Sequence, residues 1–138
     1  MQVRPWFRHA VDLAATLALA ACIAVPVPKL EPGIKHGTEI DEARLAKVVS
    51  GARKDDVLAL LGAPSVIWVD RDIYGWNWGR ANWSLLWATY GGSGLSDVTI
   101  EHWFLVRFDA AGTVVRAEHL RGGILETDGE ILRHFGGS

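Results

Sequence analysis

The sequence contains one cysteine among its 138 residues, and this scarcity already narrows the class of protein. A single cysteine cannot form an intramolecular disulfide, so a small fold held together by disulfides is excluded. The net charge of −2 lacks the Lys and Arg excess of a nucleic-acid-binding surface, and we expect no nucleic acid partner. The amino-terminal apolar run, residues 13–21, is too short to span a bilayer, which needs about 20 apolar residues.

The sequence also lacks the usual arrangements of catalytic residues. No Ser/His/Asp or Cys/His pattern is present, and the glycine-rich stretch 91–94 has neither the lysine nor the following helix of a phosphate-binding loop. The carboxylate pairs Asp41–Glu42 and Asp55–Asp56 fall at predicted helix starts, where the helix dipole favours negative charge. We therefore expect a protein that is not an enzyme and that carries no cofactor.

The amino terminus has the pattern of an export signal. Arg4 and Arg8 precede the apolar run, which ends in Leu19-Ala20-Ala21-Cys22. This ending resembles the lipobox of bacterial lipoproteins, in which the cysteine is acylated and becomes the first residue after cleavage. The resemblance implies a signal peptide over residues 1–21 and lipid attachment at Cys22. Because Ile23 rather than Asp follows the cysteine, it also implies an outer-membrane location on the periplasmic side.

An uncleaved apolar anchor over about Ala10–Val27 is the alternative interpretation of this terminus. Pro26 and Pro28 count against it because proline interrupts a continuous helix. After Cys22, the segment Ile23–Gly37 contains three Pro and two Gly residues, which predicts an extended tether over residues 22–37. An ordered arm lying on the domain is the alternative for this segment, and the domain itself is expected over residues 38–138.

Two short helices are predicted at the start of this domain. The first covers Thr38–Ser50, with Leu45, Val48 and Val49 at helical spacing. The second lies within Gly51–Pro64, where the sequence GARKDDVLALLGAP combines an apolar stripe with acidic residues in the first turn and Gly-x-Pro at the end. Together they predict a helical hairpin.

Strand patterns follow from Ser65 onward. Strands are predicted at 65–72 with continuation through 79, at 83–90, at 98–108 and at 113–120, with a hairpin turn at Asp109–Gly112. A short helix is predicted over Ile124–Phe135. The sequence therefore predicts an α+β fold, a two-layer sandwich in which the two-helix hairpin packs on a three- to four-stranded antiparallel sheet. The other sheet face is left for solvent or a partner.

Two motifs of this domain resemble one family. The stretch Gly51–Pro64, with its Leu60-Leu61-Gly62-Ala63-Pro64 ending, and the later stretch Phe108–Val114 are similar to the SmpA/OmlA (BamE) family of small outer-membrane lipoproteins. The resemblance covers about Ile40–Leu120 and implies two helices on a three-stranded antiparallel sheet. It also implies a role in outer-membrane protein assembly or envelope integrity through contacts with envelope proteins, among them the β-barrel assembly machinery.

This chain departs from the family pattern in two places. Arg53 replaces the usual Thr or Ser, so the expected side-chain cap of the second helix is missing. The region 68–103 is unusually rich in tryptophan, so partner contacts are not carried over from the family. The fold is shared with β-lactamase-inhibitor-like proteins, which makes a periplasmic inhibitor or binding module the alternative function.

The aromatic residues are the main candidates for a contact surface. One small sheet layer over two short helices cannot bury all nine large rings of the aromatic cluster, which are Trp68, Tyr74, Trp76, Trp78, Trp83, Trp87, Tyr90, Trp103 and Phe104. We expect about half to fill the core and the rest to form a recognition surface or a membrane-facing belt. The partner-binding candidates are Trp76, Trp78, Trp83 and Trp87.

Two histidines on neighbouring predicted strands are a further candidate pair. If Phe108 pairs with Thr113, His102 lies opposite His119, whereas a bulge at Gly112 separates them. Two histidines alone make an incomplete zinc site, and the sequence offers no evident third ligand. We therefore expect no metal and leave open whether the two side chains meet.

Overall fold

The computed structural model of this protein describes residues 22–122 and 128–136. The predicted signal peptide and residues 124–127 of the predicted terminal helix lie outside the described residues. The described chain divides into two compact units. The smaller unit consists of residues 22–31 and 82–98, and the larger unit consists of residues 32–81, 99–122 and 128–136.

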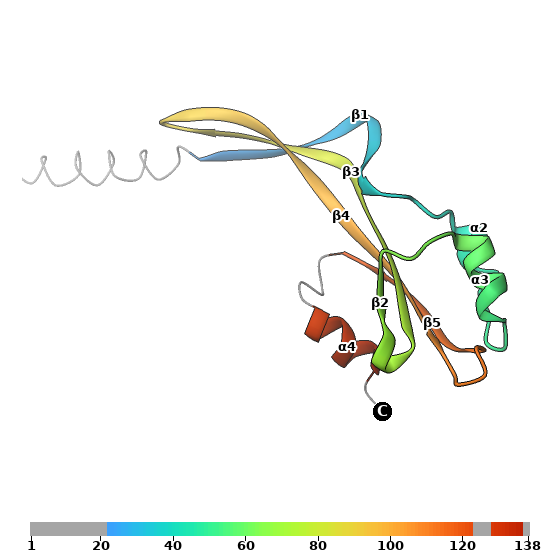
Figure 1. The fold of residues 1–138 in the computed structure, drawn as a ribbon. Coiled ribbons are helices and arrows are strands. Elements are labelled where there is room, and N and C mark those ends of the chain that lie inside the picture. Colours follow the sequence, from blue (N-terminus) through green and yellow to red (C-terminus); the bar gives the residue numbers. More distant parts are fainter. Residues whose placement is uncertain (1–21, 123–127, 137–138) are drawn as a thin grey trace, which may run out of the picture. The chain divides into compact units, whose positions relative to one another are not determined.

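Strands account for most of the described residues (Figure 1). Five of them form one sheet, in which β1, β3, β4 and β5 follow one another and β2 pairs with the start of β3. Their bounds are Ile23–Gly37 for β1, Val66–Trp68 for β2, Ile73–Thr89 for β3, Gly92–Phe108 for β4 and Val114–Arg121 for β5. The helices are α2 (Glu42–Leu45), α3 (Lys54–Leu61) and α4 (Asp128–Gly136). In the part of the chain described, no helix is long and apolar enough to cross a bilayer.

This architecture contradicts the predicted two-layer sandwich. The protein is mostly antiparallel sheet with short helices, and not a two-helix hairpin on a three- to four-stranded sheet. Three errors in the prediction account for the difference. The first predicted helix is only one turn long, the predicted tether is a strand, and the predicted strands between residues 73 and 108 are parts of two 17-residue strands.

The first helix is short because the chain must turn to reach the β4–β5 hairpin. Asp41 caps α2 by accepting a hydrogen bond from the Arg44 amide at 2.8 Å. The helix ends after Leu45, and Gly51 adopts a φ of 91° that places its amide 2.9 Å from the Val114 carbonyl. Leu45 and Val48 still reach the core, but Val49 is 58% exposed, so the predicted helical face is only partly formed.

The predicted tether forms the edge strand β1. Its three prolines, Pro26, Pro28 and Pro32, all occupy even-numbered positions. In a regular strand, alternate residues direct their N–H groups to the same side, so all three missing donors fall on one edge. Proline is tolerated where that edge carries no ladder bonds. The segment is extended, as expected, but it pairs with β3, which corresponds to the ordered arm kept as the alternative.

The second helix is present as α3 and closes as predicted. Arg53 at its start makes no side-chain cap, while Gly62 ends it with a φ of 81°. The strand after it, β2, has three residues and leads into a turn where Asp72 adopts a φ of 51°. The glycine-rich stretch 91–94 is a shorter break than predicted, because β4 already begins at Gly92.

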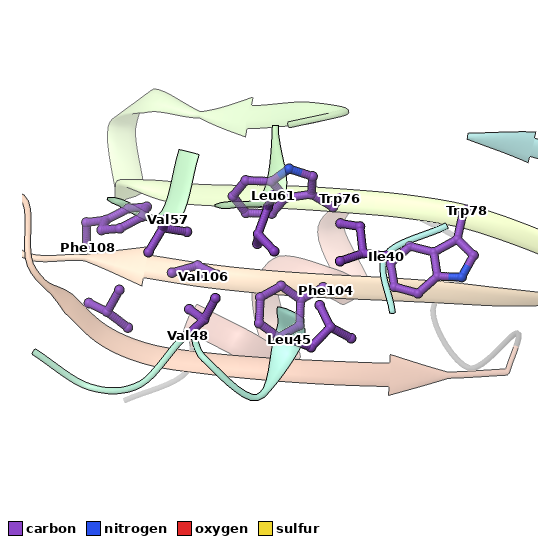
Figure 2. Close-up of a cluster of buried hydrophobic side chains, with 11 residues drawn as sticks. Ile40, Leu45, Val48, Val57, Leu61, Trp76, Trp78, Phe104, Val106 and Phe108 are labelled. Atoms are coloured by element: carbon purple, nitrogen blue, oxygen red, sulfur yellow. The ribbon is translucent and has the colours of Figure 1, made fainter. Parts of the chain in front are cut away.

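The core of the larger unit lies on both faces of its sheet. On one face, α2 and α3 cover even-numbered residues of β3 and β4 (Figure 2). The core residues on this face are Ile40, Leu45, Val48, Val57, Leu61, Trp76, Trp78, Phe104, Val106, Phe108 and Val114. On the other face, Ile73 and Leu105 pack with Ile131 and Phe135 of α4. The sheet face that was expected to meet solvent or a partner is therefore covered in this unit by α4 (Figure 1).

Polar contacts fix α4 to β5. Arg116 donates to the Phe135 carbonyl at 3.1 Å, and its guanidinium lies 4.8 Å from the centre of the Phe135 ring. Glu118 accepts from both Arg116, at 2.7 Å, and His134, at 3.1 Å. Burial alone would raise the pKa of Glu118, but these hydrogen bonds outweigh it and hold the pKa below its ordinary value.

The docking of α4 can be tested with Phe135, which is fully buried. Replacing this ring by alanine removes its packing on Leu105 and leaves a cavity, so Phe135→Ala should lower the free energy of unfolding by about 3–5 kcal/mol. Urea unfolding followed by fluorescence measures the loss. Val49→Ala, at a 58% exposed site, is the control and should cost less than about 0.5 kcal/mol. A Phe135→Ala effect as small as the control would contradict a docked α4.

Candidate functional site

A pair of histidines lies inside the larger unit, at the end of the core covered by α2. The Nδ1 atom of His102 and the Nε2 atom of His119 are 3.1 Å apart, within hydrogen-bond distance. One ring must donate its N–H to the bare nitrogen of the other, because two protonated rings would have no acceptor between them. The pair therefore satisfies its facing nitrogens when both imidazoles are neutral.

The register that brings the histidines together differs from both arrangements considered from sequence. His102 pairs across the ladder with Arg121, and His119 pairs with Phe104. The ladder shifts between Arg107 and Phe108, so the two histidines become diagonal neighbours on one sheet face. Diagonal neighbours are far enough apart to need large side chains for contact, and two imidazoles are long enough to meet.

Trp78 completes a three-ring stack with the histidines. Its ring centre is 5.1 Å from that of His102, with planes 7° apart, and 5.5 Å from that of His119. Trp78 is 2% exposed and His102 is 7% exposed. The cluster is thus a polar pair of a buried His102 and a half-buried His119, packed against an aromatic ring, with Ile40 of the core next to Trp78 (Figure 2).

Burial controls the protonation of both histidines. It lowers the pKa of His102 below 6.5, and the positive charges of His119, Arg121 and Arg80 lower it further, against the raising effect of Glu39. Burial also lowers the pKa of His119, with Glu42 acting to raise it and Arg121 to lower it. Both imidazoles are therefore held in the neutral form that ligates metals. The described residues nevertheless contain no cluster of three or more His, Cys, Asp or Glu side chains able to hold a metal ion.

The four tryptophan candidates do not form one surface. Trp76 and Trp78 do share a face of β3, as their spacing predicted, but they are 3% and 2% exposed. The Trp76 indole donates to the Gly62 carbonyl at 3.2 Å, which fixes it inside the core beneath α3. These two residues are core residues and cannot contact a partner from the surface.

Trp83 and Trp87 belong to the smaller unit and remain accessible. Trp83 is 46% exposed, and Trp87 is half-buried, with its indole donating to Ser96 at 3.2 Å. Gly94 lies directly against the Trp87 ring, and any side chain there would collide with it. Of the predicted contact residues, these two are the ones in a position to meet another molecule.

A polar network in the smaller unit had no signal in the sequence. Asp97 accepts from the Ser84 hydroxyl at 2.9 Å and from the Lys29 ammonium at 2.8 Å. The three residues come from three strands, and Lys29 is 68 positions from Asp97. Ser84 is 4% exposed, so its hydroxyl is satisfied within the sheet and does not offer a free nucleophile.

Cys22, the predicted lipid site, is the first described residue and has an exposed, free thiol. It immediately precedes β1, so it sits at the end of an ordered strand.

A separate depression of about 330 Å³ lies beside Trp76 in the larger unit and is lined by uncharged residues, among them Thr38, Leu61 and Asn77. Such a lining offers shape and hydrogen bonds but no charge to a ligand.

Comparison with protein-family models, curated proteins and solved structures gave no match for this chain. The candidate sites are therefore interpreted from their own geometry, which consists of a histidine pair, an accessible pair of tryptophans and an exposed cysteine at a strand end.

The histidine pair predicts a pH dependence of folding. Because the folded-state pKa of each histidine lies below its value of 6.5 in the unfolded chain, the unfolded state binds protons first as the pH falls. Stability should therefore be full above about pH 6.5 and decrease as the pH drops below it. Urea unfolding midpoints measured between about pH 8 and pH 5 test this.

Glutamine at these positions removes the titration while keeping hydrogen-bonding groups. His102→Gln and His119→Gln should each flatten part of the decrease in midpoint below pH 6.5. His36→Gln, which removes an exposed histidine paired with Glu101, is the comparison. If both core variants kept the wild-type pH profile, the histidine pair would not be the source of the dependence.

Proposed function

We propose that this protein is a lipoprotein of the bacterial outer membrane, anchored through Cys22 and facing the periplasm, that acts through protein contacts in the cell envelope. The observation that carries the proposal is the position of Cys22. The only cysteine of the chain follows a lipobox-like Leu19-Ala20-Ala21 sequence and is exposed immediately before the first strand. Acyl chains on this thiol would hold the protein on a membrane without a spanning segment.

The proposed role in outer-membrane protein assembly or envelope integrity rests on the SmpA/OmlA-like motifs. Although about 60 positions apart in sequence, the two motifs contact each other. The Lys54 amide donates to Gly112 at 2.8 Å, and Ala52 accepts from the Val114 amide at 2.8 Å. Arg53 and Thr113 form an antiparallel bridge between them. The motifs thus act as one structural element, which supports reading them together.

The anchoring step has a direct chemical test. Mass spectrometry of the protein purified from bacterial membranes should show loss of residues 1–21 and acyl chains on Cys22, and Cys22→Ala should abolish both changes. Ala24→Ser, at a neighbouring exposed position, should leave them intact. A wild-type chain that retains its first 21 residues, or that carries no acyl group, would refute the lipoprotein assignment.

The partner is tested by crosslinking in intact cells. Because the proposed role is in assembly, purification of the crosslinked wild-type protein should recover components of the β-barrel assembly machinery, identified by mass spectrometry. The Cys22→Ala chain, which would lack its membrane anchor, should recover less of them. Recovery of a periplasmic hydrolase in their place would contradict the assembly role and favour the inhibitor-like alternative.

A further inference from the structure

The smaller unit is depleted of charge over most of its length. Residues 22–28 and 82–96 contain no Asp, Glu, Lys, Arg or His, and they make up most of its described residues. A solvated β-sheet surface normally carries charged side chains on its exposed positions. We therefore infer that this uncharged part of the unit contacts something other than bulk water.

Most of the apolar side chains of this unit are exposed rather than buried. The most exposed are Leu30 and Tyr90, at 101% and 99%, followed by Leu95 at 64% and Ile23 at 61%. Trp83 and Leu86 are each 46% exposed, and Val25, Val27 and Val98 are also classed among the exposed residues. The unit is built from parts of β1, β3 and β4 and their Tyr90–Gly91 turn, and none of its described residues belongs to a helix that would cover them.

Most of the exposed apolar residues lie closer to Cys22 and Tyr90 than the charges do. Leu30, Trp83 and Val98 are exceptions and lie at the level of Lys29 and Asp97. The Lys29–Asp97 ion pair links β1 to β4. Cys22, which precedes β1, is seven residues before Lys29, and Tyr90, at the turn that precedes β4, is seven residues before Asp97. At about 3.3 Å per residue, Cys22 and Tyr90 both lie about 23 Å from the ion pair. Figure 1 shows the start of β1 and the turn of the β3–β4 hairpin pointing the same way.

We propose that this uncharged end of the smaller unit, which holds Cys22 and Tyr90, docks into the interface of a lipid bilayer. The proposal rests on the proposed acylation of Cys22, because acyl chains on this residue would hold the uncharged end at the membrane surface. Trp87 and Tyr90 lie within this end and are of the two residue types enriched at membrane interfaces, where an apolar ring carries a polar N–H or O–H.

The chemistry of the strands sets the depth of docking. An open sheet edge cannot enter the hydrocarbon core, because its backbone N–H and C=O groups would lose water without gaining partners. The unit therefore lies among the headgroups and inserts side chains only. Pro26 and Pro28 remove two backbone donors from the outer edge of β1, which lowers the cost of placing that edge in the interface.

The interface contact supplies a second membrane signal beside the lipid. Acyl chains alone leave the domain free to rotate about a flexible joint, and stable membrane attachment generally combines two signals. Here Cys22 is followed at once by β1, so no flexible joint separates the anchor from the ordered unit. The acyl chains and the exposed rings then contact the same patch of membrane.

The test uses tryptophan quenching by brominated lipid in the acylated, full-length processed protein. The protein is reconstituted into vesicles of phosphatidylethanolamine and phosphatidylglycerol, with and without bromine on the acyl chains. We expect emission to be quenched in brominated vesicles, and Trp87→Phe to remove most of this quenching. Trp103→Phe, which removes a tryptophan packed near α4 in the larger unit, is the control and should leave the quenching in place.

A second pair of variants tests the apolar contact itself. Leu86→Asp places a charge on an exposed residue of the smaller unit, and Val115→Asp does the same at a 45% exposed residue of the larger unit. Because a carboxylate resists transfer into the interface, Leu86→Asp should reduce the quenching of Trp87, and Val115→Asp should not.

The outcomes separate this proposal from the function it rests on. Mass spectrometry reports acylation of Cys22 independently, so a chain without acyl groups refutes the anchor before any quenching is measured. An acylated, vesicle-bound protein whose emission is insensitive to bromine refutes the docking alone. Quenching that survives Trp87→Phe also overturns the proposal. The proposal is likewise overturned if Trp87 becomes protected only on addition of envelope proteins, which would assign the surface to a protein partner.

Discussion

The second half of β4 carries the interior of the larger unit on both of its faces. Phe104, Val106 and Phe108 point toward α2 and α3, while Leu105 between them points toward α4. Because side chains alternate along a strand, one sheet can support two separate cores only if both faces are apolar. The sequence of β4 meets this condition here, and the placement of α2, α3 and α4 follows from it.

The same alternation explains where the polar groups of the larger unit are placed. His102 and His119 extend the α2-facing core beyond Phe104 and are tolerated there because they bond to each other and stack on Trp78. On the opposite face, Arg116 and Glu118 reach α4 and bond to its last turn. No buried side-chain nitrogen or oxygen among the described residues is left without a hydrogen-bond partner. Hydrogen bonds between polar side chains therefore take over in the larger unit where its apolar packing ends.

The smaller unit follows a different physical logic. It has strands without helices among its described residues, and most of its apolar side chains are exposed. Without a second layer, a short three-stranded ribbon buries little surface of its own. Its residues are therefore suited to burial against another phase or molecule, and the position of Cys22 at the start of β1 is the feature that connects this unit to the proposed membrane anchor.

Features that depend on neighbouring residues could be predicted from local patterns in the sequence. The helix ending at Gly62, the hairpin turn closed by Gly112, the strand through Phe104 and the terminal helix with Ile131 and Phe135 all have local signals, and the structure contains each of them. The sequence also identified His102 and His119 as a candidate pair and the tryptophans as candidate contact residues. The role of Cys22 remains a prediction from the lipobox pattern.

Tertiary structure decided what depends on partners distant in the chain. Proline-rich β1 forms a strand because its three prolines share one edge and its other edge pairs with β3. Amino-acid composition alone does not reveal this pairing. The predicted first helix stops early because Gly51 bonds to Val114, 63 positions away. Trp76 and Trp78 are buried while Trp83 is not, because helices cover the sheet in one unit and none is described in the other. Burial is set by which layers meet, and that is a property of the folded chain rather than of any local stretch of sequence.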